Sequence, residues 1–262
     1  MITIGLVQAP ATKNTEKNLE TIKKYIVQAK ENRCQVLCFP ESFLTGYFPE
    51  QAKELALSVS SLQILTLFDL AKEFNIDILV GFMERTTESF YLTQGIFFAD
   101  GTYDYYRKTH LGEREKQYFS SGDSLKVFTL SCGLIIGIQL CVETHYNDIT
   151  QTLSLRGAHL IFAPHATPMP SCRRKKVWEK FIPARSYDNR VYMACCNQCD
   201  KERFFGGCLV TNPEGELIAE FFEPQENLLT FSMEETTILQ YHLKQNIRCR
   251  YYPAHRKPYL YD

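Results

Sequence analysis

The sequence predicts a layered α/β fold, and two patterns in it support that prediction. Apolar runs of strand length alternate with stretches in which apolar residues recur every three or four positions, as they do on one face of a helix. Two pairs of neighbouring strand-like runs are joined by short turn segments at residues 99–101 and 131–133, which is typical of β-hairpins. Strand–helix units and hairpins in one chain indicate sheets that are covered by helices.

The order of the elements follows from the same patterns. Strands are expected at residues 2–8, 36–39, 76–82, 90–98, 102–107, 125–130, 134–140, 159–162, 191–196, 205–211, 217–222 and 228–231. The first helix follows Asn14, which can cap it, and the second follows Ser60 or Ser61. Later helices are expected at about 147–156 and 175–189. The residues expected on the buried faces of the first two helices are Leu19, Ile22, Ile26 and Val27, and Ile64, Leu65, Phe68 and Ala71.

Length and composition predict a single cytoplasmic domain. A chain of 262 residues with 45% hydrophobic content can bury a large core, so we expect one domain over residues 1–262. The formal net charge of −1 favours neither nucleic acid nor a membrane surface as a partner. No apolar run reaches the length of a spanning helix, and segment 1–7 lacks the basic start of a signal peptide. The ten cysteines are scattered through apolar runs, which favours reduced thiols over disulfides.

Three chemically useful side chains each follow an apolar strand. Cys141 comes at the end of the run 134–140, Glu41 follows the run 36–39, and Lys108 follows the run 102–107. A lone strand-end cysteine is more often a core residue, because free cysteine is among the most buried residue types. A carboxylate, an ammonium and a thiol together, however, are the base, the oxyanion partner and the nucleophile that covalent acyl transfer from an amide requires.

In these motifs the chain resembles the nitrilase superfamily of carbon-nitrogen hydrolases. In that family the Glu of a Pro-Glu motif, the Lys of an Arg-Lys-x-His motif and a strand-end Cys form the catalytic set, in this order along the chain. The resemblance therefore implies catalytic roles for Glu41, Lys108 and Cys141, with the backbone N–H of Val142 as a second oxyanion donor. It also sharpens the fold to a four-layer αββα sandwich of the nitrilase type.

The resemblance implies a second glutamate in the segment 115–123, which looks like a family loop that carries one. Glu115 is the expected residue, and it would orient Lys108 or the attacking water. Glu113 lies two residues away and is the alternative inward carboxylate. Either side chain fits the pattern.

The residues expected to bind substrate are less closely defined by the family pattern. After the nucleophile the family commonly has Asp at the second position, Arg at the fourth and Pro-Glu at the sixth and seventh. This chain has Glu143, His145, Asn147 and Asp148 there, so substrate contacts cannot be copied from the family. The side chains or backbone groups expected to line the substrate site are those of Tyr47, Val142, Glu143, His145 and His165.

What the resemblance implies is an amidohydrolase that cleaves a small linear amide or an N-carbamoyl compound without metal or organic cofactor. Nitrile hydrolysis and acyl transfer to an amine are the alternatives, and a binding protein with a vestigial site is a third. A homo-oligomer, at least a dimer, is also implied, with the tail 245–262 in its contacts. No nucleic-acid or membrane partner is expected.

Two further patterns have simpler interpretations. Cys196 and Cys199 have the spacing of a metal or redox pair, but no second such pair or histidine pair accompanies them, so neither role is expected. The basic run 173–176 begins a helical pattern and is interpreted as a solvated face or a contribution to a substrate loop.

Overall fold

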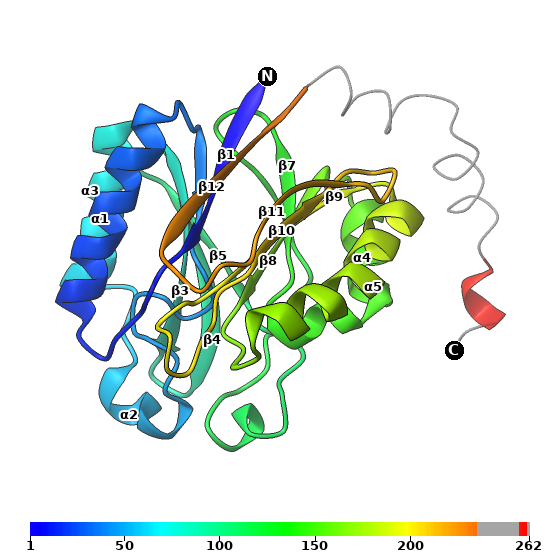
Figure 1. Cartoon of the computed structure of the whole chain (residues 1–262). Coiled ribbons are helices and arrows are strands. Elements are labelled where there is room, and N and C mark those ends of the chain that lie inside the picture. The colour runs from blue at the N-terminus through cyan, green and yellow to red at the C-terminus, as the bar shows by residue number, and fades with distance from the viewer. Residues whose placement is uncertain (235–256, 261–262) are drawn as a thin grey trace.

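Two stacked β-sheets form the centre of the molecule, and helices cover both outer faces. The computed structural model describes residues 1–234 and 257–260. In Figure 1 the helices α1 (Thr15–Glu31) and α3 (Leu62–Phe74) cover one sheet, and α4 (Asn147–Leu155) and α5 (Ser171–Asn189) cover the other. The prediction of a four-layer αββα sandwich is confirmed.

The first sheet contains most of the N-terminal half of the chain. Its strand order is β12-β1-β2-β3-β4-β5. Strands β1, β2 and β3 are parallel, whereas β12 and the β4–β5 hairpin pair with their neighbours antiparallel. The hairpin turn includes Gly101 at φ +85°, a backbone conformation that glycine adopts without strain. The bounds are β12 Asn227–Met233, β1 Ile2–Gln8, β2 Val36–Cys38, β3 Asp77–Arg85, β4 Phe90–Phe97 and β5 Tyr103–Arg107.

The second sheet repeats this plan with the later strands. Its order is β11-β10-β9-β8-β7-β6, and β7, β8 and β9 are its parallel strands. The chain then returns to the first sheet, where β12 pairs with β1. That return joins segments more than 200 residues apart, which local sequence patterns do not reveal. The bounds are β11 Leu217–Phe221, β10 Cys208–Thr211, β9 Tyr192–Asn197, β8 Leu160–His165, β7 Ile135–Ile138 and β6 Val127–Thr129.

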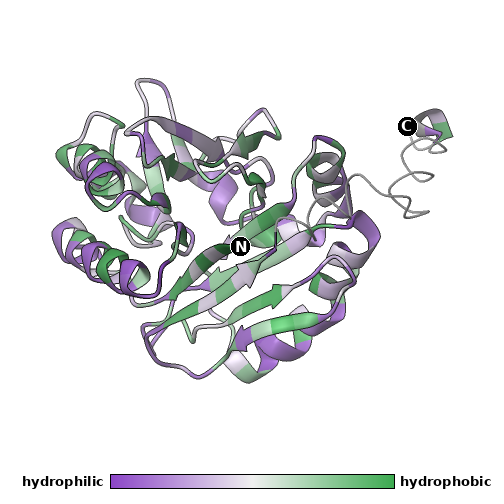
Figure 2. Ribbon diagram, turned by 90° about the horizontal axis from the view of Figure 1, so that it is seen from above, coloured by the Kyte–Doolittle hydropathy of each residue, from purple (hydrophilic) through white to green (hydrophobic). Residues whose placement is uncertain are grey.

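Apolar side chains fill the space between the sheets and the space beneath each helical layer. Between the sheets, residues such as Leu6 and Ile4 of β1 belong to the same buried cluster as Ile138 of β7 and Phe162 of β8. Separate clusters pack α1 and α3 against the first sheet and α4 and α5 against the second. Figure 2 shows hydrophobic strands at the centre and hydrophilic positions on the helices. Burial of each large apolar side chain contributes roughly 1.5–3 kcal/mol, so these three apolar layers stabilise the stacking of the sheets and helices.

The helix starts agree with the sequence patterns better than the helix faces do. Asn14 caps α1, with its side-chain oxygen accepting from the backbone N–H of Lys17 at 2.9 Å. Ser61 is the N-cap of α3 but makes no side-chain cap bond. Val27 is 39% exposed and Leu65 is 47% exposed, so placing these two on buried faces was wrong. The helical phase instead turns inward Tyr25 and Ala29 of α1 and Leu67 and Leu70 of α3.

Several boundaries differ from the predicted ranges. Strand β7 ends at Ile138, two residues before the predicted end, and β10 begins at Cys208 rather than at residue 205. Helix α5 begins at Ser171, four residues earlier than predicted. Short helices that the pattern did not indicate are η1 (Pro49–Gln51), α2 (Ala52–Leu55), η2 (Glu115–Gln117), η3 (Cys141–His145) and η4 (Pro258–Leu260).

The C-terminal tail falls largely outside the described residues. Of the segment 245–262, the structure describes 257–260 alone, so its part in oligomer contacts stays a prediction. Among the described residues, no helix has both the length and the apolar content needed to cross a membrane.

Candidate active site

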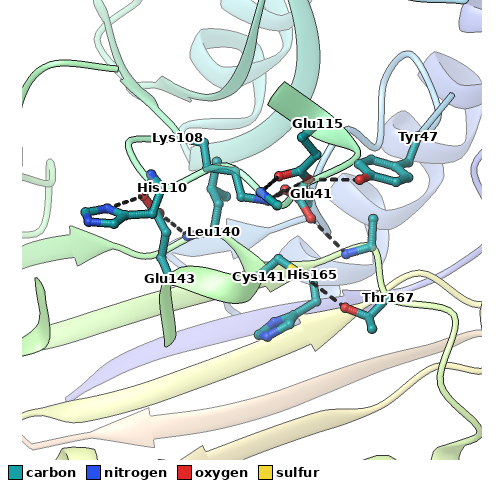
Figure 3. A network of polar contacts seen from close by, with 12 residues as sticks. Glu41, Tyr47, Lys108, His110, Glu115, Leu140, Cys141, Glu143, His165 and Thr167 are labelled. Atoms are coloured by element: carbon teal, nitrogen blue, oxygen red, sulfur yellow. Dashed lines mark hydrogen bonds and ion pairs between the residues drawn. The ribbon is translucent and has the colours of Figure 1, made fainter. Parts of the chain in front are cut away.

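Loops at the ends of strands from both sheets bring the predicted catalytic residues together. Glu41 follows β2 and Lys108 follows β5 in the first sheet, while Cys141 follows β7 in the second. Figure 3 shows the side chains of Glu41 and Lys108 side by side, with Cys141 facing them from below. The three residues are up to 100 positions apart in the chain, and the stacking of the two sheets places them at one site.

A buried cluster of charges occupies the side of the site formed by the first sheet. The Nζ of Lys108 lies 2.8 Å from Glu41 Oε1 and 2.8 Å from Glu115 Oε1, and the Lys108 and Glu41 side chains are each 1% exposed. The second oxygen of Glu41 accepts from the backbone N–H of Ala166 at 3.1 Å. With one cation between two carboxylates, the cluster is held by charge-assisted hydrogen bonds, which are shorter and stronger than neutral ones.

The structure decides between the two candidate glutamates. Glu115 is 5% exposed, and its Oε2 accepts from the backbone N–H of Gly112 at 2.6 Å. The side chain of Glu113 is 90% exposed and pairs with Lys116 at 2.5 Å. Glu115 is therefore the inward carboxylate, as its position in the loop suggested.

The pKa values in the cluster follow from burial and from these neighbours. Burial raises the pKa of Glu41 to about 7, an effect that Lys108 opposes and Glu115 reinforces. For Lys108, burial acts to lower the pKa, but the negative charges of Glu41, Cys141 and Glu115 raise it well above its usual value. Lys108 thus stays an ammonium, whereas Glu41 can gain or lose a proton near neutral pH, as a general base must.

Cys141 occupies a strained turn rather than the end of a strand. It is the first residue of η3, and its φ is +51°, a value that few residues other than glycine adopt. Its Sγ lies 3.0 Å from Thr167 Oγ1. Burial and the charge of Glu41 raise the pKa of the thiol to about 11, against the opposing effect of Lys108. The thiol is therefore protonated at neutral pH and needs a base to become a nucleophile.

The turn at Cys141 also places Val142 at the site. Val142 lies in the first turn of η3, where backbone N–H groups point out of the helix instead of to a carbonyl within it. Val142 lines the same cavity as Cys141 and Lys108. Its position fits the oxyanion donor that the sequence predicted.

A cavity of about 660 Å³ opens above these groups. Lys108, Glu115 and Cys141 are in its wall, and Tyr47 donates its hydroxyl hydrogen to Glu115 Oε1 at 2.8 Å. Tyr47 thus reaches the cavity, where it was expected. Much of the remaining wall is apolar or aromatic and includes Phe48, Pro49, Val142, Pro168, Phe204 and Phe205. A pocket of this kind suits a small molecule with one polar reacting group.

Glu143 was expected to contact the substrate, but its carboxylate instead accepts hydrogen bonds from other residues of the protein. Glu143 is fully buried and does not line the cavity. Its Oε2 accepts from Leu140 N at 2.7 Å, and its Oε1 accepts from Thr109 N and the Tyr106 hydroxyl, each at 2.8 Å. These bonds tie the turn before Cys141 to the segment after Lys108, because a buried carboxylate needs several donors.

The two histidines predicted as substrate-binding residues also lie outside the cavity lining. His145 is exposed, and its ring packs on Phe181 with centroids 4.5 Å apart. His165 is 3% exposed, its Nδ1 lies 2.8 Å from Ala163 O, and its ring packs on Trp178. Burial lowers the pKa of His165 to about 3, so this side chain is a neutral packing residue beneath the site. Figure 3 shows its ring pointing away from Lys108.

Sequence patterns missed Thr167 and Arg203. Thr167 touches the sulfur of Cys141, and its N–H donates to Asn197 Oδ1 at 2.9 Å. Arg203 lies on the cavity wall and stacks over the Phe48 ring at 4.1 Å. The position of Thr167 just after a strand end was the available signal, whereas Arg203 lies in a loop with no distinguishing pattern.

The remaining patterns have structural explanations. Cys196 and Cys199 are buried and form no disulfide with each other. No group of three or more potential metal-binding side chains occurs among residues 1–234 and 257–260. In the basic run 173–176, Arg174 is 1% exposed, so the prediction that this run forms a solvated face was wrong for Arg174. It reaches the loop that carries Thr167, which agrees with the alternative of a contribution to a substrate loop.

Comparisons with known proteins agree with this geometry. The model of the carbon-nitrogen hydrolase family matches residues 3–241, so the chain belongs to that family. It is a hydrolase that acts on carbon–nitrogen bonds other than peptide bonds.

The individual relatives are only distantly similar to this chain in sequence. A nitrilase from Pyrococcus abyssi is 29% identical over 87% of this chain and 88% of its own length. An omega-amidase from Xenopus laevis is 30% identical over 83% of both chains. An amidase from Nesterenkonia sp. has the same fold, with a TM-score of 0.79 and 24% identity over 90% of this chain and 92% of that chain.

Proposed function

We propose that this protein is a cysteine amidohydrolase that cleaves a small linear amide or an N-carbamoyl compound through a thioester on Cys141. The observation that carries the proposal is that a thiol and a buried lysine line one cavity, and that the lysine is paired at 2.8 Å with a buried carboxylate whose pKa is about 7. These are the groups that amide cleavage needs, and a cavity of about 660 Å³ suits a small substrate.

In the first half of the reaction, ionised Glu41 takes the proton of the Cys141 thiol as the sulfur attacks the carbonyl carbon. The negative charge that develops on the carbonyl oxygen is stabilised by Lys108 Nζ and the N–H of Val142. When the C–N bond breaks, Glu41 returns the proton to the leaving nitrogen, and ammonia or an amine departs. The acyl group remains on sulfur as a thioester.

In the second half, water attacks the thioester. Glu41 now takes a proton from that water, and the same two donors stabilise the second tetrahedral state. Collapse breaks the C–S bond and returns the proton to the sulfur. Glu115 holds the Lys108 ammonium in place through both halves, because its carboxylate bonds Nζ at 2.8 Å beside the bond from Nζ to Glu41.

The names of the relatives support this class of substrate without choosing within it. They include an omega-amidase from Xenopus laevis and an N-carbamoylputrescine amidase from Solanum tuberosum. Nitrile hydrolysis is a second candidate, since the relative from Pyrococcus abyssi is named a nitrilase. Acyl transfer to an amine uses the same thioester and differs only in the group that resolves it.

An activity screen over linear amides, N-carbamoyl amines, N-carbamoyl amino acids and nitriles tests the proposal. We expect ammonia or amine release from an amide or carbamoyl compound without an added acceptor, and none from Cys141→Ala. Turnover that requires an added amine would make the protein an acyltransferase. Turnover of nitriles alone would make it a nitrilase. Failure of every compound both to turn over and to acylate Cys141 would contradict the proposal.

A further inference from the structure

A buried arginine lies beneath the loop that contacts Cys141. Arg174, near the start of α5, is 1% exposed. Its Nη2 donates to the carbonyl oxygen of Thr167 at 2.5 Å and to that of Met169 at 3.0 Å. Its Nε is buried and has no hydrogen-bond partner in the described part of the chain. The guanidinium is therefore held by neutral carbonyl groups and is not fully satisfied.

In the described part of the chain, the charge of Arg174 has no carboxylate partner. Within residues 1–234 and 257–260, the ion pairs of the structure do not include Arg174. The indole ring of Trp178 lies 5.2 Å from its guanidinium carbon. Burial lowers its pKa to about 10, and the titratable groups whose charge favours the cation are the thiols of Cys141 and Cys195. Burial of an unpaired charge is unfavourable, so its retention invites a functional explanation.

The surrounding backbone is shaped to admit this side chain. Gly207 has a φ of +123°, and a Cβ added there would lie 2.5 Å from Arg174 Cδ. A residue with a side chain at position 207 would clash with the arginine and would also strain the backbone. Gly207 thus keeps space for the arginine side chain.

Thr167 connects the guanidinium to the sulfur. Its carbonyl accepts from Arg174, its N–H donates to Asn197 Oδ1, and its hydroxyl lies 3.0 Å from Cys141 Sγ. With both backbone groups fixed, the hydroxyl has a defined direction. It can donate to the sulfur once the thiol has lost its proton.

We propose that Arg174 is a positioning residue of the active site. It holds the Thr167 hydroxyl against Cys141, and it supplies positive potential that is compensated only when negative charge develops on the sulfur or on the tetrahedral oxygen. This inference rests on the proposed role of Cys141 as nucleophile. A merely structural arginine would anchor the loop without changing the reactivity of the thiol.

The charges that face Cys141 set the expected direction of the effect. Glu41 and Glu115 disfavour a thiolate, whereas Lys108 and the hydrogen bond from Thr167 favour it. Arg174 adds a second cation on the side of the second sheet, where His165 is neutral. Removal of the arginine charge should therefore raise the pKa of the thiol and lower its reactivity at a given pH.

The test measures the rate at which iodoacetamide alkylates Cys141, in a Cys172→Ser background because Cys172 is exposed. For Arg174→Gln we expect a rate about tenfold lower at pH 7 and a pH profile displaced to higher pH, which corresponds to about one pKa unit. We also expect kcat for the amide substrate to fall by a similar factor with little change in KM, because the charge acts on the transition state.

Arg185→Gln is the matched control. Arg185 is another α5 arginine that donates to backbone carbonyls, those of Thr144 at 3.4 Å and His145 at 3.0 Å. These two residues form the end of η3, whereas Cys141 is at its start. We expect its alkylation rate to equal that of the parent. Thr167→Val removes the hydroxyl and leaves the Arg174 bonds intact, and we expect a severalfold fall.

Folded Arg174→Gln that is alkylated at the parent rate would overturn the proposal, and so would an equal fall in Arg185→Gln. If Arg174→Gln does not fold, Arg174→Lys takes its place. A retained cation predicts a rate within about threefold of the parent, and a fall of tenfold or more would overturn the charge argument. The alkylation measurement does not depend on hydrolysis. If the protein cleaved no amide in the screen but showed these alkylation rates, the proposed function would fail while this inference would stand.

Discussion

The two sides of the active site balance their charges in different ways. On the side of the first sheet, the Lys108 ammonium lies between the carboxylates of Glu41 and Glu115, and every charge has an opposite neighbour. On the side of the second sheet, the Arg174 cation bonds to two carbonyl oxygens and lies over the Trp178 ring, and the thiol of Cys141 is uncharged at neutral pH.

This difference indicates that the two sheets supply different groups to the proposed reaction. The paired side contains a proton acceptor that is already held in position, since a buried carboxylate between a lysine and a backbone N–H has little freedom to move. The unpaired side contains the strained turn at Cys141, and on our proposal the Arg174 charge favours the negative sulfur that forms during reaction. Substitutions on the two sides should therefore have different consequences for activity and for stability.

The largest effect is expected for Cys141→Ala on the second side. Turnover should fall by about four orders of magnitude or more, because no other group can form the covalent intermediate. The melting temperature should stay close to that of the parent, because the substitution removes a single sulfur atom from a residue that lines a cavity and belongs to none of the apolar clusters. Amide turnover and thermal unfolding are the measurements, with Cys172→Ser as the control of unchanged activity. Retained turnover in Cys141→Ala would remove the mechanism.

Lys108→Met on the first side should affect both activity and stability. We expect kcat to fall at least about a hundredfold, the scale on which one oxyanion donor acts, with little change in substrate binding. We also expect a loss of about 3–5 kcal/mol of stability, because two buried carboxylates lose their cation. Lys108→Arg should not restore kcat, since a planar guanidinium cannot replace a compact ammonium between two carboxylates. Near-normal kcat in Lys108→Met would contradict the assignment.

The pH dependence should reveal Glu41. Its pKa of about 7 predicts that kcat/KM rises as pH rises through that value, because only the ionised carboxylate accepts the thiol proton. This pKa lies above the ordinary value of 4.5, so the folded state binds more protons than the unfolded state between the two. The contribution of Glu41 to stability therefore decreases as pH rises from about 4.5 to 7.

Glu41→Gln tests both parts of that prediction. The rising limb of the kcat/KM profile near pH 7 should disappear together with most of the activity. The melting temperature of the variant relative to the parent should increase between pH 5 and pH 8, since the glutamine pays no cost of burying a charge at high pH. An unchanged pH profile, or a relative melting temperature that falls with pH, would show that Glu41 is not the titrating base.

A smaller effect is expected where the two sides meet. Glu143 accepts from Leu140 on the second side and from Thr109 and Tyr106 on the first, so Glu143→Gln should cost about 1–3 kcal/mol of stability. Because Glu143 does not line the cavity, KM should change by less than about twofold, within the scatter of a residue with no substrate contact. Denaturant unfolding and steady-state kinetics check the two parts. A large rise in KM would restore the substrate contact that the sequence predicted.

The sequence was informative wherever a residue's role depends on its place at the end of a strand. The apolar runs before Glu41, Lys108 and Cys141 indicated that each residue follows a strand, although Cys141 lies in a turn three residues after β7 ends. Asn14 likewise followed from local capping chemistry. These features depend on residues that are close in sequence, so they can be predicted from the sequence alone.

Features that depend on distant contacts were not predictable in this way. Glu143, His145 and His165 lie near Cys141 or a strand end in sequence, but none lines the cavity. Hydrogen bonds with the backbone hold the buried Glu143 and His165, and the exposed His145 packs on Phe181. Thr167 and Arg174 matter because α5 and the loop after β8 pack beneath η3, and Arg174 resembles a solvated residue of a basic run. The positive φ of Cys141 also arises from the tertiary fold, since nothing in its local sequence requires it.

The most direct test of the account is to trap the covalent intermediate. Glu41→Gln keeps the thiol and Lys108 but lacks the base for hydrolysis, so a small reactive ester should acylate it slowly and remain bound. Intact-mass spectrometry should show one added acyl group, peptide mapping should place it on Cys141, and the variant that also has Cys141→Ala should show none. An acyl group on another residue, or an adduct that survives the loss of Cys141, would contradict the central claim.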